Sequence, residues 1–221
     1  MLLTKTSAVS ISNAKDSRAP VALIGVVRRS AASSFMLEDM TGEIEARFES
    51  PFPVDDGDVV CARGPVAGGV MQCKEVLLPD VPLIRATGRM DARLLLTSGK
   101  SDEGCDVVIS TAPIDTDTKN VVVGDSPSTI NLYKDGGRVC VLFYKNTDGL
   151  APQDVVSMLK RRCLRLPKPQ VASCVIEPVP DILWVSGAGK SWTEIYKGIR
   201  IVHTCGGSAA IDLSSMETKL A

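Results

Sequence analysis

The sequence predicts a mostly β protein of the α+β class, and two observations support this prediction. Short strand-like segments recur along the chain, separated by Gly, Pro, Asp and Ser residues that favour turns. Only one stretch, near residues 148–165, has a clear helical pattern. The length of 221 residues allows one large domain or two small ones, and a hydrophobic content of 44% is typical of a globular chain.

Five strands are expected in the first part of the chain, over residues 20–28, 34–38, 43–49, 58–63 and 70–78. The third has the cleanest alternation, with Ile44, Ala46 and Phe48 on one face and charged residues on the other. Five short strands joined by tight turns predict a small barrel or sandwich. Residues 1–19 are small and polar, and we expect a flexible or loosely docked arm there.

The histidine and cysteine content limits the chemistry of this chain. His203 is the single histidine, so a hydrolase triad would have to use it, and a multi-histidine metal centre is excluded. We expect it to be structural. The seven cysteines contain no C-x-x-C pair, which argues against a zinc ribbon or a disulfide framework and favours a reducing compartment. We expect neither a signal peptide nor a membrane span, because no apolar run approaches about 20 residues.

The segment WVSGAGKSW, residues 184–192, raises the possibility of a nucleotide-binding loop. Its Gly189-Lys190-Ser191 end fits the pattern G-x-x-x-x-G-K-[ST], but Trp184 stands where the first glycine is required. The residues that follow alternate like a strand, whereas a phosphate-binding loop leads into a helix. The sequence therefore disfavours an ATPase.

Two runs in the first half resemble a known architecture. LEDMTGEIEARF, residues 37–48, with DDGDVVCARGPV after it, resembles part of an oligonucleotide/oligosaccharide-binding (OB) barrel. VLLPDVPLI, residues 76–84, then resembles the crossing from such a barrel into a calcineurin-like phosphoesterase domain, as in the small (B) subunit of archaeal family-D and eukaryotic replicative DNA polymerases. The resemblance implies an OB barrel over 20–85 and a truncated phosphoesterase-like β-sandwich with few helices over 86–221.

Residues 151–166, 180–183 and 196–202 extend the resemblance. Active members of the family hold two metal ions with motifs that include G-H-x-H, Y-H-G and G-N-H-D. At the matching positions this chain has Gly187 and Gly189, then Lys145, and only Asp115. The resemblance therefore implies a degenerate site without metal or other cofactor. As a hypothesis, Lys145 or Lys190 lies beside Asp115 in place of the metal ions.

The family implies a non-catalytic scaffold subunit that binds the C-terminal region of a polymerase catalytic subunit. Such a chain would meet DNA through the assembled complex, without a membrane or a small-molecule substrate, in the cytoplasm of an archaeon or the nucleus of a eukaryote. Two alternatives stay open. One is a stand-alone single-stranded DNA-binding OB protein, which would use aromatics such as Phe35, Phe48 and Phe52 but would meet many acidic residues. The other is a metallophosphoesterase or exonuclease with a remodelled site.

The predicted helix over residues 148–165 ends in the strongest basic cluster of the sequence. This cluster consists of Lys160, Arg161, Arg162, Arg165 and Lys168. Cations near a helix C-terminus complement the helix dipole, so the cluster can be an ordinary solvated helix end. Alternatively, it faces DNA in an assembled polymerase, in which case its removal would reduce the salt dependence of DNA affinity.

Overall fold

The computed structural model describes residues 1–221 except 1–6, 16, 18, 53, 100–103 and 166–174, and it is mostly β. The chain divides into two compact units. We call residues 1–82 with 160–162 the barrel unit, and residues 83–159 with 163–221 the sandwich unit. The division falls three residues before the expected boundary at residue 85. No helix in the described ranges is long and apolar enough to cross a membrane.

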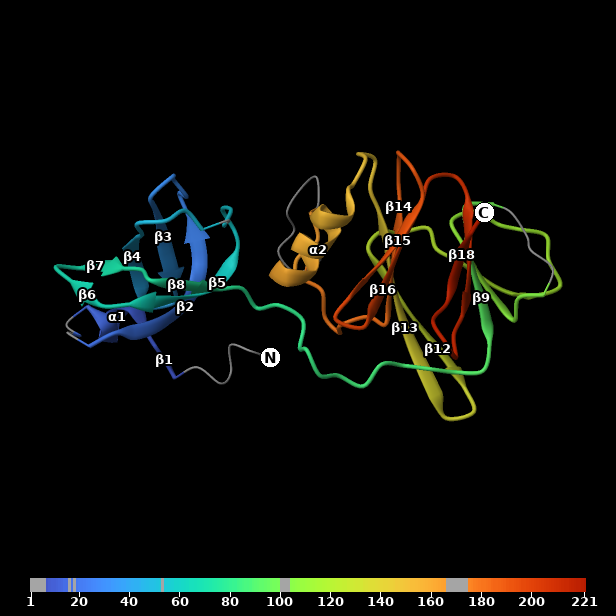
Figure 1. Ribbon diagram of the computed structural model, residues 1–221, viewed down its shortest axis with the longest axis horizontal. Helices are drawn as coiled ribbons and strands as arrows, with labels where there is room; N and C mark the ends of the chain where they lie inside the picture. Colours follow the sequence, from blue (N-terminus) through green and yellow to red (C-terminus); the bar gives the residue numbers. More distant parts are fainter. Residues whose placement is uncertain (1–6, 16, 18, 53, 100–103, 166–174) are drawn as a thin grey trace. The chain divides into compact units, whose positions relative to one another are not determined.

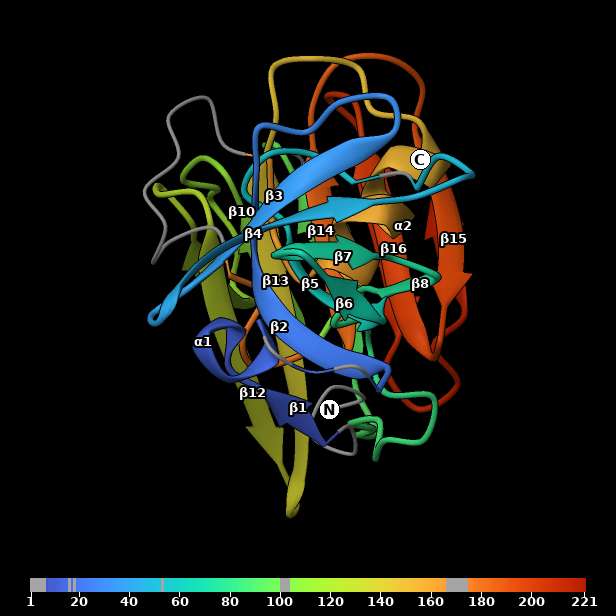
Figure 2. The ribbon, with the colours of Figure 1, turned by 90° about the vertical axis from the view of Figure 1, so that its left-hand side faces the viewer.

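The barrel unit is built on one strongly bent sheet (Figures 1 and 2). Its main strands are β2 (Val21–Arg28), β3 (Ser34–Asp39), β4 (Gly42–Arg47), β5 (Val59–Gly64), β6 (Val66–Ala67), β7 (Val70–Gln72) and β8 (Glu75–Leu77), paired in the order β6-β7-β4-β3-β2-β5-β8. The five predicted segments therefore all form strands. The fifth, residues 70–78, is divided into β7 and β8.

This division closes the sheet into a barrel. β7 runs parallel to β4, while β8 runs antiparallel to β5, and only Cys73 and Lys74 separate β7 from β8. The Cys73 N–H donates to the Arg47 carbonyl of β4, and the Lys74 N–H donates to the Arg63 carbonyl of β5. One continuous segment thus joins both ends of the sheet. The segment bends at Cys73 and Lys74 because it pairs first with β4 and then with β5.

The barrel core follows the predicted alternation. Ile44 and Ala46 of β4 are buried, as are inward-facing residues of the neighbouring strands. The described part of the N-terminal segment is docked more firmly than the flexible or loosely docked arm expected over residues 1–19. Strand β1 (Ala8–Val9) pairs with β2, and helix α1 (Ile11–Ala14) buries Ile11 and Ala14 completely against the barrel core. The Ile11 N–H also donates to the Asp39 carboxylate over 2.9 Å.

The sandwich unit contains two five-stranded sheets. Sheet B has the order β11 (Lys119–Val122), β10 (Val107–Ser110), β9 (Arg93–Thr97), β17 (Ser208–Asp212) and β18 (Thr218–Leu220). Sheet C has the order β12 (Ser128–Lys134), β13 (Gly137–Lys145), β14 (Ile182–Ser186), β16 (Ile199–Thr204) and β15 (Trp192–Tyr196). Within sheet B, β9, β10 and β11 are parallel, and within sheet C, β13, β14 and β16 are parallel.

Alternate residues of the two sheets meet in one core. Leu94 and Ile211 of sheet B belong to the same buried cluster as Phe143, Trp184 and Val202 of sheet C. The rings of Phe143 and Trp184 lie 4.7 Å apart between centroids. Because strand side chains alternate between faces, the neighbours of these residues point to the outer faces of the sheets.

Helix α2 (Pro152–Arg161) lies against the outer face of sheet C (Figure 1). It is shorter than the expected helix over residues 148–165. Its start agrees with the sequence, because Pro152 is its first residue and the Asp154 carboxylate accepts the Ala151 N–H over 3.1 Å. Its early end has a backbone cause, since Arg162 adopts a left-handed φ of 55°.

Candidate functional site

The C-terminal ends of six parallel strands gather at one end of the sandwich unit, which we call the strand-end rim. The six strands end at Thr97, Ser110, Val122, Lys145, Ser186 and Thr204. The two sheets reach this rim together, because β16 ends at Thr204, only four residues before Ser208, and Ser208 of β17 pairs with Thr97. Ligand-binding sites in sheets with parallel strands commonly form at the carboxyl ends of the strands. This rim is therefore the first place to look for a binding or catalytic site.

Buried polar side chains are concentrated at the strand-end rim. They are Thr97, Ser110, His203, Thr204 and Ser208, each at most 8% exposed. Their hydroxyl groups are used within the protein. Ser110 Oγ donates to Asn120 Oδ1 over 3.0 Å, and Thr204 Oγ1 accepts from Trp184 Nε1 over 2.9 Å. Alcohols and amides that bond one another in this way stabilise strand ends, and they are poor ligands for a pair of dications.

His203, the single histidine of the chain, is buried in the rim. Its Nδ1 lies 3.0 Å from the Lys190 carbonyl, so Nδ1 carries the proton in the neutral ring, and Trp192 stacks on it at 5.3 Å. Nε2 is buried without a hydrogen-bond partner among the described residues. Burial lowers the pKa of His203 below its usual 6.5, although the bond to Lys190 opposes this shift. The ring is therefore neutral at pH 7.

Gly187 and Gly189, which the sequence resemblance placed at a G-H-x-H loop, have backbone roles. A Cβ atom on Gly187 would lie 2.6 Å from the Asn146 carbonyl oxygen and 3.4 Å from His203 Nε2. Gly189 has a φ of +106°, which only glycine adopts readily. The loop then enters β15 at Trp192 instead of a helix, so it lacks the helix N-terminus of a phosphate-binding loop.

The two lysines at the rim do not form the expected pair with Asp115. Lys145, Lys190 and Asp115 are all exposed, and no ion pair joins either lysine to Asp115 in the described structure. The backbone N–H of Lys145, in contrast, donates to Ser126 Oγ over 2.7 Å. The described structure therefore shows no ion pair that would support a lysine replacing the metal ions beside Asp115, and this hypothesis stays a prediction. Among the described residues there is also no group of three or more His, Cys, Asp or Glu that could hold a metal ion.

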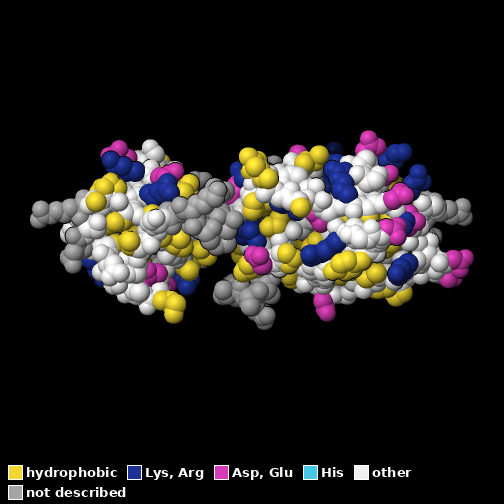
Figure 3. Space-filling view, turned by 90° about the horizontal axis from the view of Figure 1, so that it is seen from below, with side chains coloured by type: hydrophobic (Ala, Val, Ile, Leu, Met, Phe, Trp, Pro, Cys, Tyr) yellow, Lys and Arg dark blue, Asp and Glu magenta, His cyan; other side chains and the backbone are white. Residues whose placement is uncertain are grey.

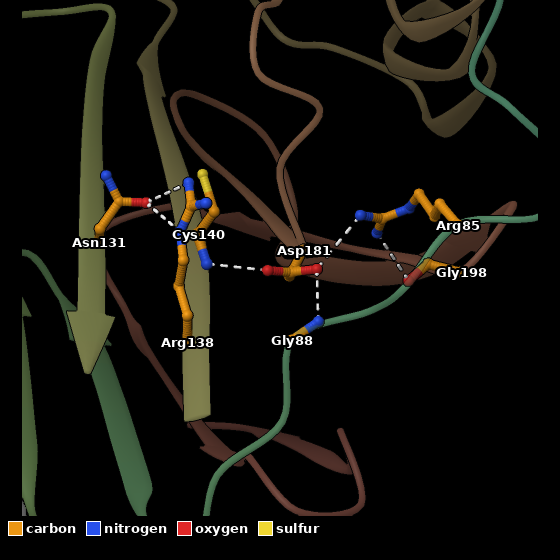
Figure 4. Close-up of polar contacts among 7 residues, drawn as sticks. All are labelled: Arg85, Gly88, Asn131, Arg138, Cys140, Asp181 and Gly198. Carbon is orange, nitrogen blue, oxygen red and sulfur yellow. Dashed lines mark hydrogen bonds and ion pairs between the residues drawn. The ribbon is translucent and has the colours of Figure 1, made fainter. Parts of the chain in front are cut away.

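The opposite end of the sandwich unit contains a buried carboxylate, Asp181, just before β14 (Figure 4). Asp181 Oδ2 accepts the Cys140 N–H of β13 over 2.8 Å, and Oδ1 accepts the Gly88 N–H over 2.8 Å. Arg85 completes the set with an ion pair of 3.1 Å to Oδ1 and a hydrogen bond of 3.2 Å to the Gly198 carbonyl. We call this network the Asp181 clamp.

The Asp181 clamp attaches the chain segment that enters the sandwich unit to sheet C. Gly88 passes so close to β13 that a Cβ atom would lie 1.9 Å from the Arg138 carbonyl oxygen. Burial, followed by the charge of Asp181, raises the pKa of the Cys140 thiol, which keeps that thiol protonated. The sequence pattern singled out Asp181 only as part of a strand. The clamp was missed because its partners are distant in sequence and two of them are backbone N–H groups.

The members of the basic cluster have different surroundings. Lys160 and Arg165 are exposed, and Arg165 lies 4.0 Å from Asp154. Arg161, counted in the barrel unit, is 15% exposed and forms ion pairs with Asp55 and, at 3.5 Å, with Asp58. Arg162, also counted in the barrel unit, is half-buried. Lys168 lies outside the described residues. On the face shown in Figure 3, basic and acidic side chains are interspersed over the sandwich unit.

The barrel unit has an aromatic and basic hollow of its own. A cavity of about 430 Å³ is lined by residues that include Arg47, Phe48, Phe52 and Lys74. The rings of Phe48 and Phe52 meet edge to face at 5.3 Å. Phe48 is 9% exposed and belongs to the core, whereas Phe52 is half-buried beside it. Arg47 is held by the Glu45 carboxylate at 2.8 Å.

Comparisons with known proteins give little guidance. No protein-family model matches the chain, and no curated protein matches it. Among solved structures, the solution NMR structure of Thermotoga maritima protein TM1076 is similar at 18% sequence identity and a TM-score of 0.35. This match covers 59% of the present chain and 97% of the other. A TM-score of 0.35 is too low to indicate a shared fold.

Proposed function

We propose that this protein is a non-catalytic scaffold subunit of a replicative DNA polymerase, with an OB barrel followed by a degenerate phosphoesterase-like sandwich. In this role it would hold the C-terminal region of the large catalytic subunit, and DNA would be met only by the assembled complex. The sequence resemblance motivates the proposal. The structure contributes an architecture compatible with it.

The strand-end rim is the observation that supports this proposal most. In a dinuclear phosphoesterase this end would present imidazoles and carboxylates around two metal ions. In this chain, hydroxyl groups bonded to protein partners occupy the rim, two glycines shape its loop, and the lysines point into solvent. A rim of this composition favours a role in architecture.

Two features of the barrel support an OB assignment. The first is closure of the sheet through the bent segment of residues 70–77, which pairs with β4 and then with β5. The second is the parallel pairing of β4 with β7 within a barrel whose other main strands, apart from the short β1 on β2, pair antiparallel. OB barrels serve both as nucleic-acid platforms and as protein-interaction modules, so the fold leaves the ligand to be determined.

Affinity purification of the tagged chain from its native source tests the scaffold proposal. We expect a polymerase catalytic subunit to co-purify in a stoichiometric amount at moderate salt. Deletion of the C-terminal region of that subunit should abolish its recovery, while a deletion of similar length elsewhere should not. Recovery of the chain without any polymerase subunit, or with one whose C-terminal region is dispensable, would contradict the proposal.

The barrel hollow favours a second candidate function, binding of single-stranded nucleic acid by the chain alone. The half-buried Phe52 could stack with a base, and Arg47 and Lys74 could contact phosphates. Fluorescence anisotropy with an oligothymidylate should then show binding that weakens with salt. Substitution of Phe52 by Ala should weaken it by about 1–3 kcal/mol. Salt-independent or undetectable binding by the isolated chain would eliminate this candidate.

A further inference from the structure

Strand β15 forms a free edge of sheet C. In the part of the chain that the structure describes, β15 pairs with β16 on one side and with no strand on the other. Ile195, next to the last residue of the strand, is 55% exposed. Its backbone N–H donates to the carboxylate of the adjacent Glu194 over 2.9 Å, which is a local substitute for a partner strand. An edge with exposed backbone groups is a template for strand addition.

An incompletely paired arginine lies beside this edge. Arg200 of β16 is the register partner of Ile195, so both side chains project from the same face of sheet C. Arg200 Nε is buried without a hydrogen-bond acceptor, and no ion pair to its guanidinium occurs among the described residues. Burial and the nearby charge of Arg89 lower the pKa of Arg200, against the attraction of Glu194. A carboxylate that approaches this half-buried guanidinium from outside would supply the missing counter-charge.

Two exposed apolar side chains directly precede the Asp181 clamp in the chain. Leu83 is 76% exposed and Ile84 is 92% exposed. The next residue, Arg85, is held by Asp181 and by the carbonyl of Gly198, which lies in the turn between β15 and β16. The Asp181 clamp therefore fixes the point at which this apolar pair leaves the sandwich unit. Adjacent large aliphatic side chains at such exposure are typical of a contact surface.

We propose that the free edge of β15 binds an extended, acidic segment of a partner chain as an added strand, with a carboxylate on Arg200 and apolar side chains against Ile195. The occupant is a peptide because the edge offers alternating backbone donors and acceptors, which a nucleic acid cannot match in register. It is acidic because the guanidinium of Arg200 has no counter-charge in an ion pair among the described residues. Leu83 and Ile84 extend the apolar contact. This inference does not depend on the polymerase assignment.

A titration of the full-length chain with two defined peptides tests the proposal. The probe is a ten-residue peptide of alternating Val and Glu, and the matched probe replaces every Glu by Lys. Backbone amide NMR should show saturable shifts at residues 193–200 with the Val/Glu peptide, and a response at least tenfold weaker with the Val/Lys peptide. The Arg200→Gln variant should weaken binding of the Val/Glu peptide at least tenfold, and Ile195→Thr should also weaken it.

Matched controls come from the opposite edge of the same sheet. Arg138→Gln and Tyr133→Thr change a cation and an exposed apolar residue at β12 and β13, and both should leave the titration unchanged. The proposal is overturned if millimolar Val/Glu peptide leaves residues 193–200 unshifted. It is also overturned if both peptides act equally, or if Arg200→Gln binds like the parent while its thermal unfolding is unaltered. None of these outcomes bears on whether a polymerase subunit co-purifies.

Discussion

The two ends of the sandwich unit differ in how their buried titratable side chains are hydrogen-bonded. At the Asp181 clamp, both carboxylate oxygens have partners, supplied by Gly88, Cys140 and Arg85. At the strand-end rim, His203 is just as deeply buried, yet only one of its two ring nitrogens has a partner. Both carboxylate oxygens of the clamp are therefore bonded, although Arg85 Nε is buried without a partner among the described residues, and at the rim His203 Nε2 retains an unused lone pair.

This difference indicates what each end does for the molecule. A buried charge that is fully paired is costly to disturb, because removing one partner leaves the other without compensation. The clamp therefore fixes the entry of the chain into sheet C. The rim is built from neutral groups and glycine turns, so it tolerates more change. Substitutions at matched positions of the two ends should reveal this asymmetry as differences in the free energy of unfolding.

The largest effect is expected at the clamp. Asp181→Asn removes the negative charge from a site where the Arg85 side chain is only 12% exposed, so the arginine stays buried without its counter-charge. We expect a loss of about 3 kcal/mol in the free energy of unfolding, measured by urea denaturation. Asp115→Asn, at an exposed carboxylate, is the control and should change it by less than about 0.5 kcal/mol. If the two substitutions lowered the free energy of unfolding equally, the clamp would contribute no more than an exposed carboxylate, which would contradict the prediction.

Glycine substitutions compare the two ends with a single added methyl group. A Cβ atom at Gly88 would lie 1.9 Å from the Arg138 carbonyl oxygen, and one at Gly187 would lie 2.6 Å from the Asn146 carbonyl oxygen. We expect Gly88→Ala to cost about 3 kcal/mol or more and Gly187→Ala to cost less, because the shorter approach requires a larger backbone shift. Gly189→Ala meets no atom within 4 Å and should cost only about 1 kcal/mol, from its positive φ. Urea denaturation of the three variants gives the order, and a reversal of the first two would contradict it.

The sequence predicted the mostly β architecture because alternation is a local signal. Ile44 and Ala46 of β4 are buried where the pattern placed them. The bend at Cys73 and Lys74 was not predictable, because it depends on two partner strands that are distant in sequence. Strand β1 and helix α1 were missed because elements of two and four residues carry almost no periodic signal.

The candidate site was less accessible to sequence reasoning. Gly187 and Gly189 were assigned from a family motif, and the structure adds the backbone reasons for both glycines. The Asp181 clamp depends on backbone N–H groups, which every residue except proline carries, so no residue pattern marks it. The lysine pairing with Asp115 was inferred from motif positions and charge, and all three side chains are exposed in the structure. In each of these cases the role of the residue depends on which groups lie beside it in the folded chain, and the sequence does not give that information.

A moderate effect is expected from pH at the rim. His203 has a lowered pKa in the folded state, so the unfolded chain binds more protons once the pH falls below about 6.5. Stability should therefore be complete above this pH and decrease as the pH falls below it, with a slope of at most about 1.4 kcal/mol per pH unit. Urea denaturation between pH 7.5 and 5.5 measures it. Because the chain has one histidine, His203→Gln should flatten the dependence of the free energy of unfolding on pH. An unchanged dependence in this variant would mean that groups other than His203 cause it.

The smallest effects are expected from the lysines of the rim. Lys145→Ala and Lys190→Ala each remove an exposed side chain without an ion pair to Asp115, and the Lys190 carbonyl that holds His203 is retained in the variant. Each should change the free energy of unfolding by less than about 0.5 kcal/mol. A double-mutant cycle of Lys145→Ala with Asp115→Ala should give a coupling energy near zero, since groups without contact are additive. A coupling of about 1 kcal/mol or more would mean that the lysine does occupy the place of the metal ions, and the rim would then hold a compensated charge like that of the clamp.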